Sequence, residues 1–182
     1  LVAPAAAEVL KQVKYVSTAT VTLGYKKEGF SHALDGFGFV VPKCENRSIL
    51  ACTWTSSKFP HRAPEGYVML RCYLGGALRE DIAEKDEHTM TRLVRQDLKE
   101  IMGIEEKPVF CKVFHNRKSN VQYQVNHSVR IDTLMKELDA FPGLFLAGSA
   151  YRGIGIPDCI QSGNESAESV IQFLADKSKA EI

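Results

Sequence analysis

The stretch "GLFLAGSAYRGIGIPDCIQSGN" at residues 143–164 joins a continuous apolar run to a turn-rich loop and then to a helical pattern. The run "LFLAG" (144–148) is short and wholly apolar, which is typical of a parallel strand covered on both faces. The loop that follows contains two glycines and a proline but few polar side chains, whereas surface loops are normally polar. We therefore expect its backbone to lie against a flat partner, with a helix beginning after Asn164. The apolar residues on one side of that helix are Ala167, Val170, Ile171 and Leu174.

The order of strand, loop and helix also predicts an anion site. The first N–H groups of a helix are unpaired, and the helix dipole is positive at that end. Residues 162–164, "SGN", offer capping chemistry for this terminus, and Asp158 is expected to cap the turn. The loop is not a Rossmann fingerprint, because Asp158 stands in place of a third glycine after Gly153 and Gly155. The motif also lies about 150 residues too late for a first βαβ unit.

Two interpretations of the loop remain open. The plain one is a Gly-Pro connector between a strand and a helix. The other is a wall for a flat ring, because Ile154, Ile156 and Ile160 would gain nothing in an exposed connector. A flavin needs a flat apolar wall and N–H donors beside its pyrimidine edge, and a loop with bare backbone amides supplies both. The second interpretation predicts a flavin cofactor at this loop.

The part of the chain that precedes this loop predicts an antiparallel sheet. Residues 16–25 alternate apolar Ala19, Val21 and Leu23 with threonines, which is the period of a half-buried strand. Further β-rich runs separated by turn residues occupy residues 37–41, 48–54, 67–75 and 108–114. In the third of these runs, one face carries Val68, Leu70, Cys72 and Leu74. Residues 56–66, which hold two prolines and a glycine, are expected to form a loop.

Two helices are predicted within and after this block. One begins at Asp86 and ends at Gly103. Its apolar stripe consists of Met90, Leu93, Val94, Leu98, Ile101 and Met102. The other covers residues 130–141 before "PG" stops it, with Ile131, Leu134, Met135 and Leu138 on one face.

The fold class that follows is α+β, in which a mostly antiparallel sheet with helices precedes a terminal strand-loop-helix of α/β character. Residues 1–14 hold the end of a strand ("LVAP") and a connecting helix. Residues 15–114 form the antiparallel block with one long helix, and residues 115–182 form the return segment. Because the chain opens halfway along an element and without Met, we expect a fragment of a longer protein.

Composition excludes several classes of function. The chain has 182 residues, of which 45% are hydrophobic, and its 23 Lys and Arg nearly balance its 22 Asp and Glu. A balanced charge argues against nucleic acid as a partner. The five cysteines form no C-x-x-C pair, which argues against a zinc site or a disulfide framework and favours a reducing, cytoplasmic location. No apolar run is long enough to cross a bilayer, so membrane association is expected to be peripheral at most.

Two longer segments carry a resemblance to a known family. They are "GFGFVVPKCENRSILACTWTSSKFPHRAPEGYVMLRCYLGG" (36–76) and "GLFLAGSAYRGIGIPDCIQSG" (143–163). Together they resemble the C-terminal part of the FAD-dependent protoporphyrinogen/coproporphyrinogen oxidases of haem biosynthesis, particularly the Gram-positive bacterial type. The resemblance extends over nearly the whole chain.

The resemblance implies a two-domain flavoprotein of the amine-oxidase-like type. The antiparallel block would belong to its substrate domain, and the final strand, loop and helix would complete its FAD domain. Ile154, Gly155 and Ile156 would lie against the isoalloxazine, with Gly148 and Gly153 beside them. The family removes six hydrogens from a porphyrinogen in three flavin cycles, with oxygen as the acceptor and hydrogen peroxide as the by-product. Such chemistry requires no metal, and no catalytic side chain is assigned.

Individual residues refine this expectation. The family often carries Trp near the flavin, a few residues before a Pro-x-Tyr, whereas Asn116 and Val121 stand at those positions here, so Asn116 becomes a candidate cofactor contact. Among the arginines, Arg152 is best placed to pair with a carboxylate of the porphyrinogen, because it adjoins the flavin loop. Two alternatives stay open. The isolated fragment is a non-catalytic binding or folding module, or the parent is another enzyme of the flavin amine oxidase-like group. The choice of porphyrinogen and the oligomeric state are also left open.

Overall fold

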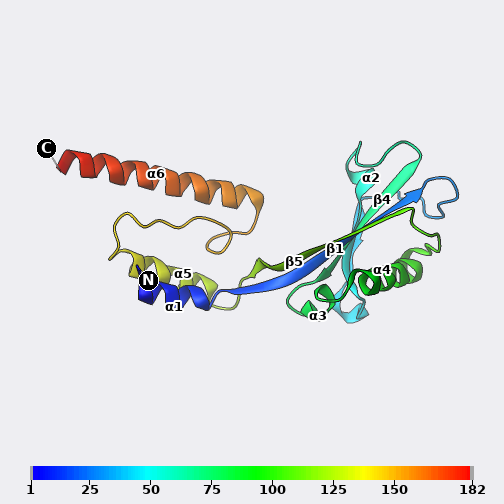
Figure 1. Ribbon diagram of the computed structural model, residues 1–182, viewed down its shortest axis with the longest axis horizontal. Helices are drawn as coiled ribbons and strands as arrows, with labels where there is room; N and C mark the ends of the chain where they lie inside the picture. Colours follow the sequence, from blue (N-terminus) through cyan, green and yellow to red (C-terminus); the bar gives the residue numbers. More distant parts are fainter. Residues whose placement is uncertain (1, 181–182) are drawn as a thin grey trace. The chain divides into compact units, whose positions relative to one another are not determined.

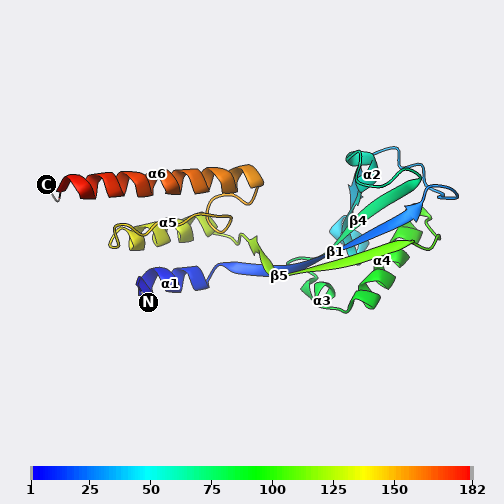
Figure 2. The ribbon, with the colours of Figure 1, turned by 45° about the horizontal axis from the view of Figure 1, so that its top comes forward.

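The structure is a computed structural model that describes residues 2–180. The chain divides into two compact units. The larger unit consists of Val16–Asn120, and the smaller unit joins the residues up to Tyr15 to those from Val121 onwards. The larger unit extends past the predicted boundary at 114, because its last strand continues through the polar residues 115–122. Figures 1 and 2 show the elements from two directions.

A five-stranded sheet in the order β2-β3-β4-β1-β5 forms the larger unit. The strands are β1 (Lys14–Lys26), β2 (Gly38–Val40), β3 (Ile49–Trp54), β4 (Tyr67–Gly75) and β5 (Phe110–Gln122). The pairs β1/β4, β2/β3 and β3/β4 are antiparallel. The amide of Val109 donates to the Gly24 carbonyl and the Asn120 side chain to the Thr18 hydroxyl, so β5 also runs antiparallel to β1. The predicted antiparallel sheet is confirmed.

The sheet buries the faces that the alternation predicts. Ala19, Val21 and Leu23 on β1 are fully buried, as are Leu70, Cys72 and Leu74 on β4. Each of these side chains belongs to a single hydrophobic cluster shared with helix α4 (Glu87–Met102). Two-residue periodicity therefore identified the core strands correctly, because one face of each is removed from water.

Helix α4 begins and ends where capping residues predict. The Asp86 carboxylate accepts a hydrogen bond from the Thr89 amide at 2.9 Å, and Gly103 ends the helix with φ of 70°. Met90, Val94 and Leu98 are fully buried. Ile101, which was predicted to belong to the same stripe, is instead 39% exposed, because it lies at the edge of the helix face that meets the sheet.

The sequence does not predict the short helical turns of the larger unit. Helix α2 (Thr55–Lys58) occupies the start of the segment predicted as a loop, and α3 (Glu80–Ala83) and the 3-10 turn η1 (Lys43–Glu45) were not predicted. Each is a single turn whose residues show no helical periodicity of their own. Tertiary packing stabilises such turns, as the fully buried Ile82 and Ala83 of α3 illustrate.

The smaller unit contains α1 (Pro4–Lys11), α5 (His127–Leu138) and α6 (Ile156–Ala180). Helices α1 and α5 lie side by side (Figure 2) and bury Ala3, Ala6, Ile131 and Leu134 between them. The end of a strand was predicted for residues 1–4, but residues 2–4 form none. Val2 and Ala3 have no regular secondary structure, and Pro4 is the first residue of α1. Proline suits this position, where its missing N–H leaves no hydrogen bond unmade. Leu1 lies outside the described residues.

Two predictions for the end of the chain are wrong. Residues 144–148 form no strand, and Leu144 and Phe145 are exposed. A strand needs a hydrogen-bonded neighbour, and no described residue of this unit supplies one. Helix α6 begins at Ile156 and not after Asn164, because Pro157 fits the first turn of a helix and Asp158 caps it. In addition, no helix within residues 2–180 is long and apolar enough to span a membrane.

Candidate functional site

The loop from Gly148 to Gly155, with the first turn of α6, is the candidate site. Gly148 has φ of 123° and Gly153 has φ of 127°, a region that side chains rarely adopt. A Cβ on Gly153 would lie 2.6 Å from the Asp158 side chain, so this glycine permits the close approach of the loop to α6. The Gly148 amide donates to the Ser162 hydroxyl at 3.1 Å, which ties the start of the loop to the same helix.

Tyr123 holds the loop from the other side. Its hydroxyl donates to the Ser149 carbonyl at 2.7 Å and accepts from the Gly153 amide at 2.8 Å. The ring of Tyr123 stacks on that of His127, with centroids 3.8 Å apart, and His127 Nε2 lies 3.0 Å from the Tyr151 carbonyl. Sequence reasoning missed both side chains. Tyr123 stands at the tyrosine of the family's Pro-x-Tyr pattern, but that pattern gave it no partner, because the contacts join residues more than twenty positions apart.

Asp158 occupies the N-terminus of α6. Its Oδ2 accepts from the Gly155 amide at 3.0 Å, and the Cys159 amide donates to the Gly155 carbonyl at 3.0 Å. The capping role predicted for Asp158 is confirmed. The capping role predicted for residues 162–164 is wrong, because these residues lie inside α6. A carboxylate at the helix terminus already supplies the negative charge that the dipole favours, which weakens the case for an anion site there.

The outer surface of the loop is apolar. Ile154 is 65% exposed and Ile156 is 78% exposed, and Ile160 on the next turn of α6 is also exposed. Within residues 2–180, no hydrogen bond engages the amide of Ile154. An exposed apolar surface beside a free amide fits one side of a flavin ring, which requires a flat contact and an N–H donor. The loop residues are therefore compatible with this cofactor.

The other predicted site residues lie in different surroundings. The Arg152 guanidinium is 2.7 Å from the Asp132 carboxylate on α5, and both side chains are more than half exposed. Asn116 is an exposed residue of β5 in the larger unit. The structure thus places five predicted residues in the loop and Ile156 at the first position of α6, while Asn116 belongs to the other unit. The five are Gly148, Arg152, Gly153, Ile154 and Gly155.

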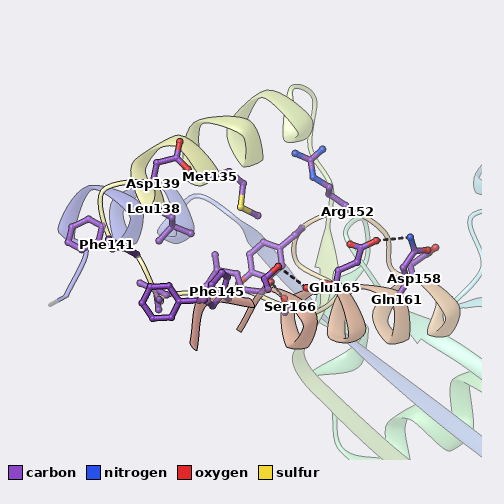
Figure 3. Close-up of a pocket in the computed structure, with 18 residues that line it drawn as sticks. Met135, Leu138, Asp139, Phe141, Phe145, Arg152, Asp158, Gln161, Glu165 and Ser166 are labelled. Atoms are coloured by element: carbon purple, nitrogen blue, oxygen red, sulfur yellow. Dashed lines mark hydrogen bonds between the residues drawn. The ribbon is translucent and has the colours of Figure 1, made fainter. Parts of the chain in front are cut away.

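A cavity of about 680 Å³ lies beside this loop within the smaller unit. Figure 3 shows Met135 and Leu138 reaching toward it from α5, and Gln161, Glu165 and Ser166 from α6. Tyr151 also lines it, and partial burial raises the pKa of the Tyr151 hydroxyl. No cluster of His, Cys, Asp and Glu within residues 2–180 is arranged to hold a metal ion.

Comparisons with known proteins identify the family. The family model described as "Flavin containing amine oxidoreductase" matches residues 1–171. The coproporphyrinogen III oxidase of Bacillus subtilis is 37% identical over 166 residues, which cover 91% of this chain and 35% of that protein. The enzyme of the same name from Staphylococcus aureus is 33% identical over 165 residues, which cover 90% of this chain and 35% of that protein.

A solved structure agrees with these matches. The crystal structure of a candidate protoporphyrinogen oxidase from Exiguobacterium has a TM-score of 0.77 and 31% identity to this chain. The alignment covers 93% of this chain and 36% of that one. The chain therefore spans about a third of the length of the relatives it matches. Because the family model extends over most of the sequence, the chain belongs to the flavin-containing amine oxidoreductase family.

Proposed function

We propose that this chain is the C-terminal portion of an FAD-dependent porphyrinogen oxidase of haem biosynthesis. The parent protein would oxidise protoporphyrinogen IX or coproporphyrinogen III to the porphyrin. The observation that carries the proposal is the 37% identity to a coproporphyrinogen III oxidase over 91% of the chain. The apolar loop before α6 supports it, since its exposed face suits a flavin. The five cysteines, none of them in a C-x-x-C pair, support a cytoplasmic parent, with membrane contact at most peripheral.

The loop residues would hold the cofactor in this proposal. Gly148, Gly153, Ile154, Gly155 and Ile156 would face it, with Asn116 as a further contact. FAD, when bound, would accept a hydride equivalent in each two-electron oxidation of the porphyrinogen. Ile154 and Ile156 would exclude water from one side of the site, because both are apolar and project outward from the loop. Asp158 and Tyr123 hold the loop backbone in place through the amides of Gly155 and Gly153.

The overall reaction balances with oxygen as the electron acceptor. A porphyrinogen loses six hydrogens in three two-electron oxidations, and one molecule of oxygen takes up each electron pair with two protons to form hydrogen peroxide. This chain would position the cofactor and exclude water from it, which agrees with the apolar character of the loop.

Arg152 would bind a carboxylate of the porphyrinogen. Its guanidinium has five N–H donors, so it can keep its contact with Asp132 through one edge and present another edge to the substrate. The pair is exposed and therefore weak in water, so exchange of partners would cost little.

A second candidate is an amine oxidase, which the description of the matching family model favours. The full-length protein discriminates between the two. We expect it to carry flavin, and to generate porphyrin fluorescence and peroxide from coproporphyrinogen III or protoporphyrinogen IX under air. Peroxide that depends on an added amine, with no porphyrin formed, would replace the proposal with the second candidate. A full-length protein that carries flavin and oxidises neither class would overturn both. If the isolated 182-residue chain is folded and colourless, it acts as a folding module of the parent.

A further inference from the structure

We propose that Tyr123 and His127 are positioning residues that hold the loop backbone in the conformation that meets the flavin. This inference rests on the proposed function, because it concerns the same loop. Neither residue was predicted from the sequence, and both belong to the same unit as the loop.

The Tyr123 hydroxyl closes the loop by bonding to both of its sides. It donates to the carbonyl of Ser149 at 2.7 Å and accepts from the amide of Gly153 at 2.8 Å. A hydroxyl can donate and accept through the same oxygen atom. Tyr123 lies between β5 and α5, and its long side chain reaches the loop from there. Phenylalanine would fill the same space but leave the two backbone groups without this partner.

His127 makes the third contact and supports the tyrosine ring. Its Nε2 lies 3.0 Å from the carbonyl of Tyr151, which only accepts, so Nε2 carries the hydrogen. The imidazole stacks on the Tyr123 ring at an interplanar angle of 13°. His127 is the first residue of α5 and is buried, so the helix fixes its position. The two rings together contact the backbone of residues 149, 151 and 153.

These contacts leave one peptide free for a ligand. The Gly153 amide is bonded to Tyr123 and the Gly155 amide to Asp158, on either side of Ile154. Bonds at both neighbours restrict the rotation of the Ile154 peptide, whose own amide is free. A donor held in place before binding costs less entropy when the ligand arrives. Tyr123 and His127 therefore set the direction of the N–H that would face the flavin.

The first test measures hydrogen exchange in the full-length protein. Tyr123→Phe is compared with Tyr15→Phe, because the Tyr15 hydroxyl makes no hydrogen bond within residues 2–180 and lies in the same unit. We expect the amide of Gly153 to exchange roughly tenfold faster in Tyr123→Phe and to be unchanged in Tyr15→Phe. Equal exchange in the two variants would show that the hydroxyl does not hold the loop, and would overturn the proposal.

The second test measures FAD itself, without turnover. We expect Tyr123→Phe to bind FAD several-fold more weakly and to alter the visible circular dichroism of the flavin, with Tyr15→Phe matching the wild type. At His127, glutamine retains an N–H near the position of Nε2, whereas phenylalanine retains only the ring. If His127→Gln keeps the wild-type flavin spectrum and His127→Phe does not, the hydrogen bond of His127, and not its ring, is what the flavin site requires.

The outcomes separate this inference from the proposed function. Faster exchange at Gly153 together with an unchanged FAD affinity and spectrum would show a structural tie only, and would overturn the role toward the flavin. A wild-type parent that binds no FAD would overturn the proposed function and that role with it. The exchange measurement would still decide whether Tyr123 holds the loop.

Discussion

Asp97 is the buried carboxylate that joins helix α4 to strand β3. Its Oδ2 accepts from the amides of Ser48 at 2.8 Å and Ile49 at 3.0 Å, and the residue is 6% exposed. Asp97→Ala would leave both amides without an acceptor, so we expect the free energy of unfolding to fall by about 2–3 kcal/mol. Urea denaturation measures this loss. Asp97→Asn, which keeps an acceptor oxygen, should lose less, and a loss in Asp97→Ala no larger than that of the exposed Asp81→Ala would contradict the prediction.

Glu80 makes stability depend on pH. The ammonium of Lys118 and the amide of Ser17 donate to its carboxylate, and they lower its pKa from an ordinary 4.5 to about 2. Because the folded pKa lies below the unfolded one, the stabilisation is complete above the unfolded value and is lost as the pH falls toward the folded value. We expect wild type to exceed Glu80→Gln in thermal midpoint at neutral pH, and this difference to vanish near pH 2. A difference that does not change with pH would contradict this account.

Arg152 provides a test of substrate binding in the full-length enzyme. If it pairs with a carboxylate of the porphyrinogen, Arg152→Ala should raise KM roughly tenfold and change kcat little, because the contact is the same in ground and transition states. Asp132→Ala removes its present partner but leaves the guanidinium, so KM should stay the same or fall. If KM rises equally in both variants, the ion pair acts by holding the loop in place, and Arg152 does not bind the substrate directly.

These side chains also mark the limit of prediction from sequence. The capping role of Asp158 could be predicted, because its acceptor lies three residues from the amide it binds. The roles of Tyr123 and His127 could not, since their partners lie 24 to 30 residues away and are ordinary backbone groups. A local pattern reports neighbours along the chain, whereas these contacts exist only after α5 and the loop come together.

Helix α4 depends on its N-terminal cap. The Asp86 carboxylate accepts from the amide and the hydroxyl of Thr89, which lowers its pKa. We expect Asp86→Ala to cost about 1 kcal/mol of unfolding free energy, while Asp86→Asn keeps most of the stability. Chemical denaturation of the three proteins would decide the matter. If alanine and asparagine lose equally, the side chain does not cap the helix.

Elements were predicted well where periodicity and capping agreed, as in β1, β4 and α4. The segment 144–148 was not, because its apolar composition describes a buried environment that no described neighbour provides. Helix α6 likewise carries apolar residues that no described neighbour covers. Ile156, Ile171 and Leu174 are all more than half exposed, so these three side chains are not covered by any described residue. A sequence can predict that a segment tends to be buried, but the burial is not seen where no described residue covers the segment.

The two units should therefore differ in their resistance to proteolysis. The larger unit contains the main hydrophobic cluster, whereas the cluster of the smaller unit is built around two alanines, Ile131 and Leu134. Few buried contacts allow local opening at low free energy. We expect thermolysin to cut the isolated 182-residue chain first within residues 139–179 and to leave a fragment containing Val16–Asn120. Mass spectrometry of the products over time identifies the first cuts.

Two comparisons test the proteolysis prediction further. In the full-length protein the same residues should be protected, because the exposed apolar side chains of α6 would then be covered. In the isolated chain, Ile171→Asp should lower the binding of a hydrophobic dye while leaving the resistance of residues 16–120 unchanged. First cuts within β3 or β4 would mean that the sheet, and not the smaller unit, is the less stable part. The exposed face of α6 would then have to be explained in another way.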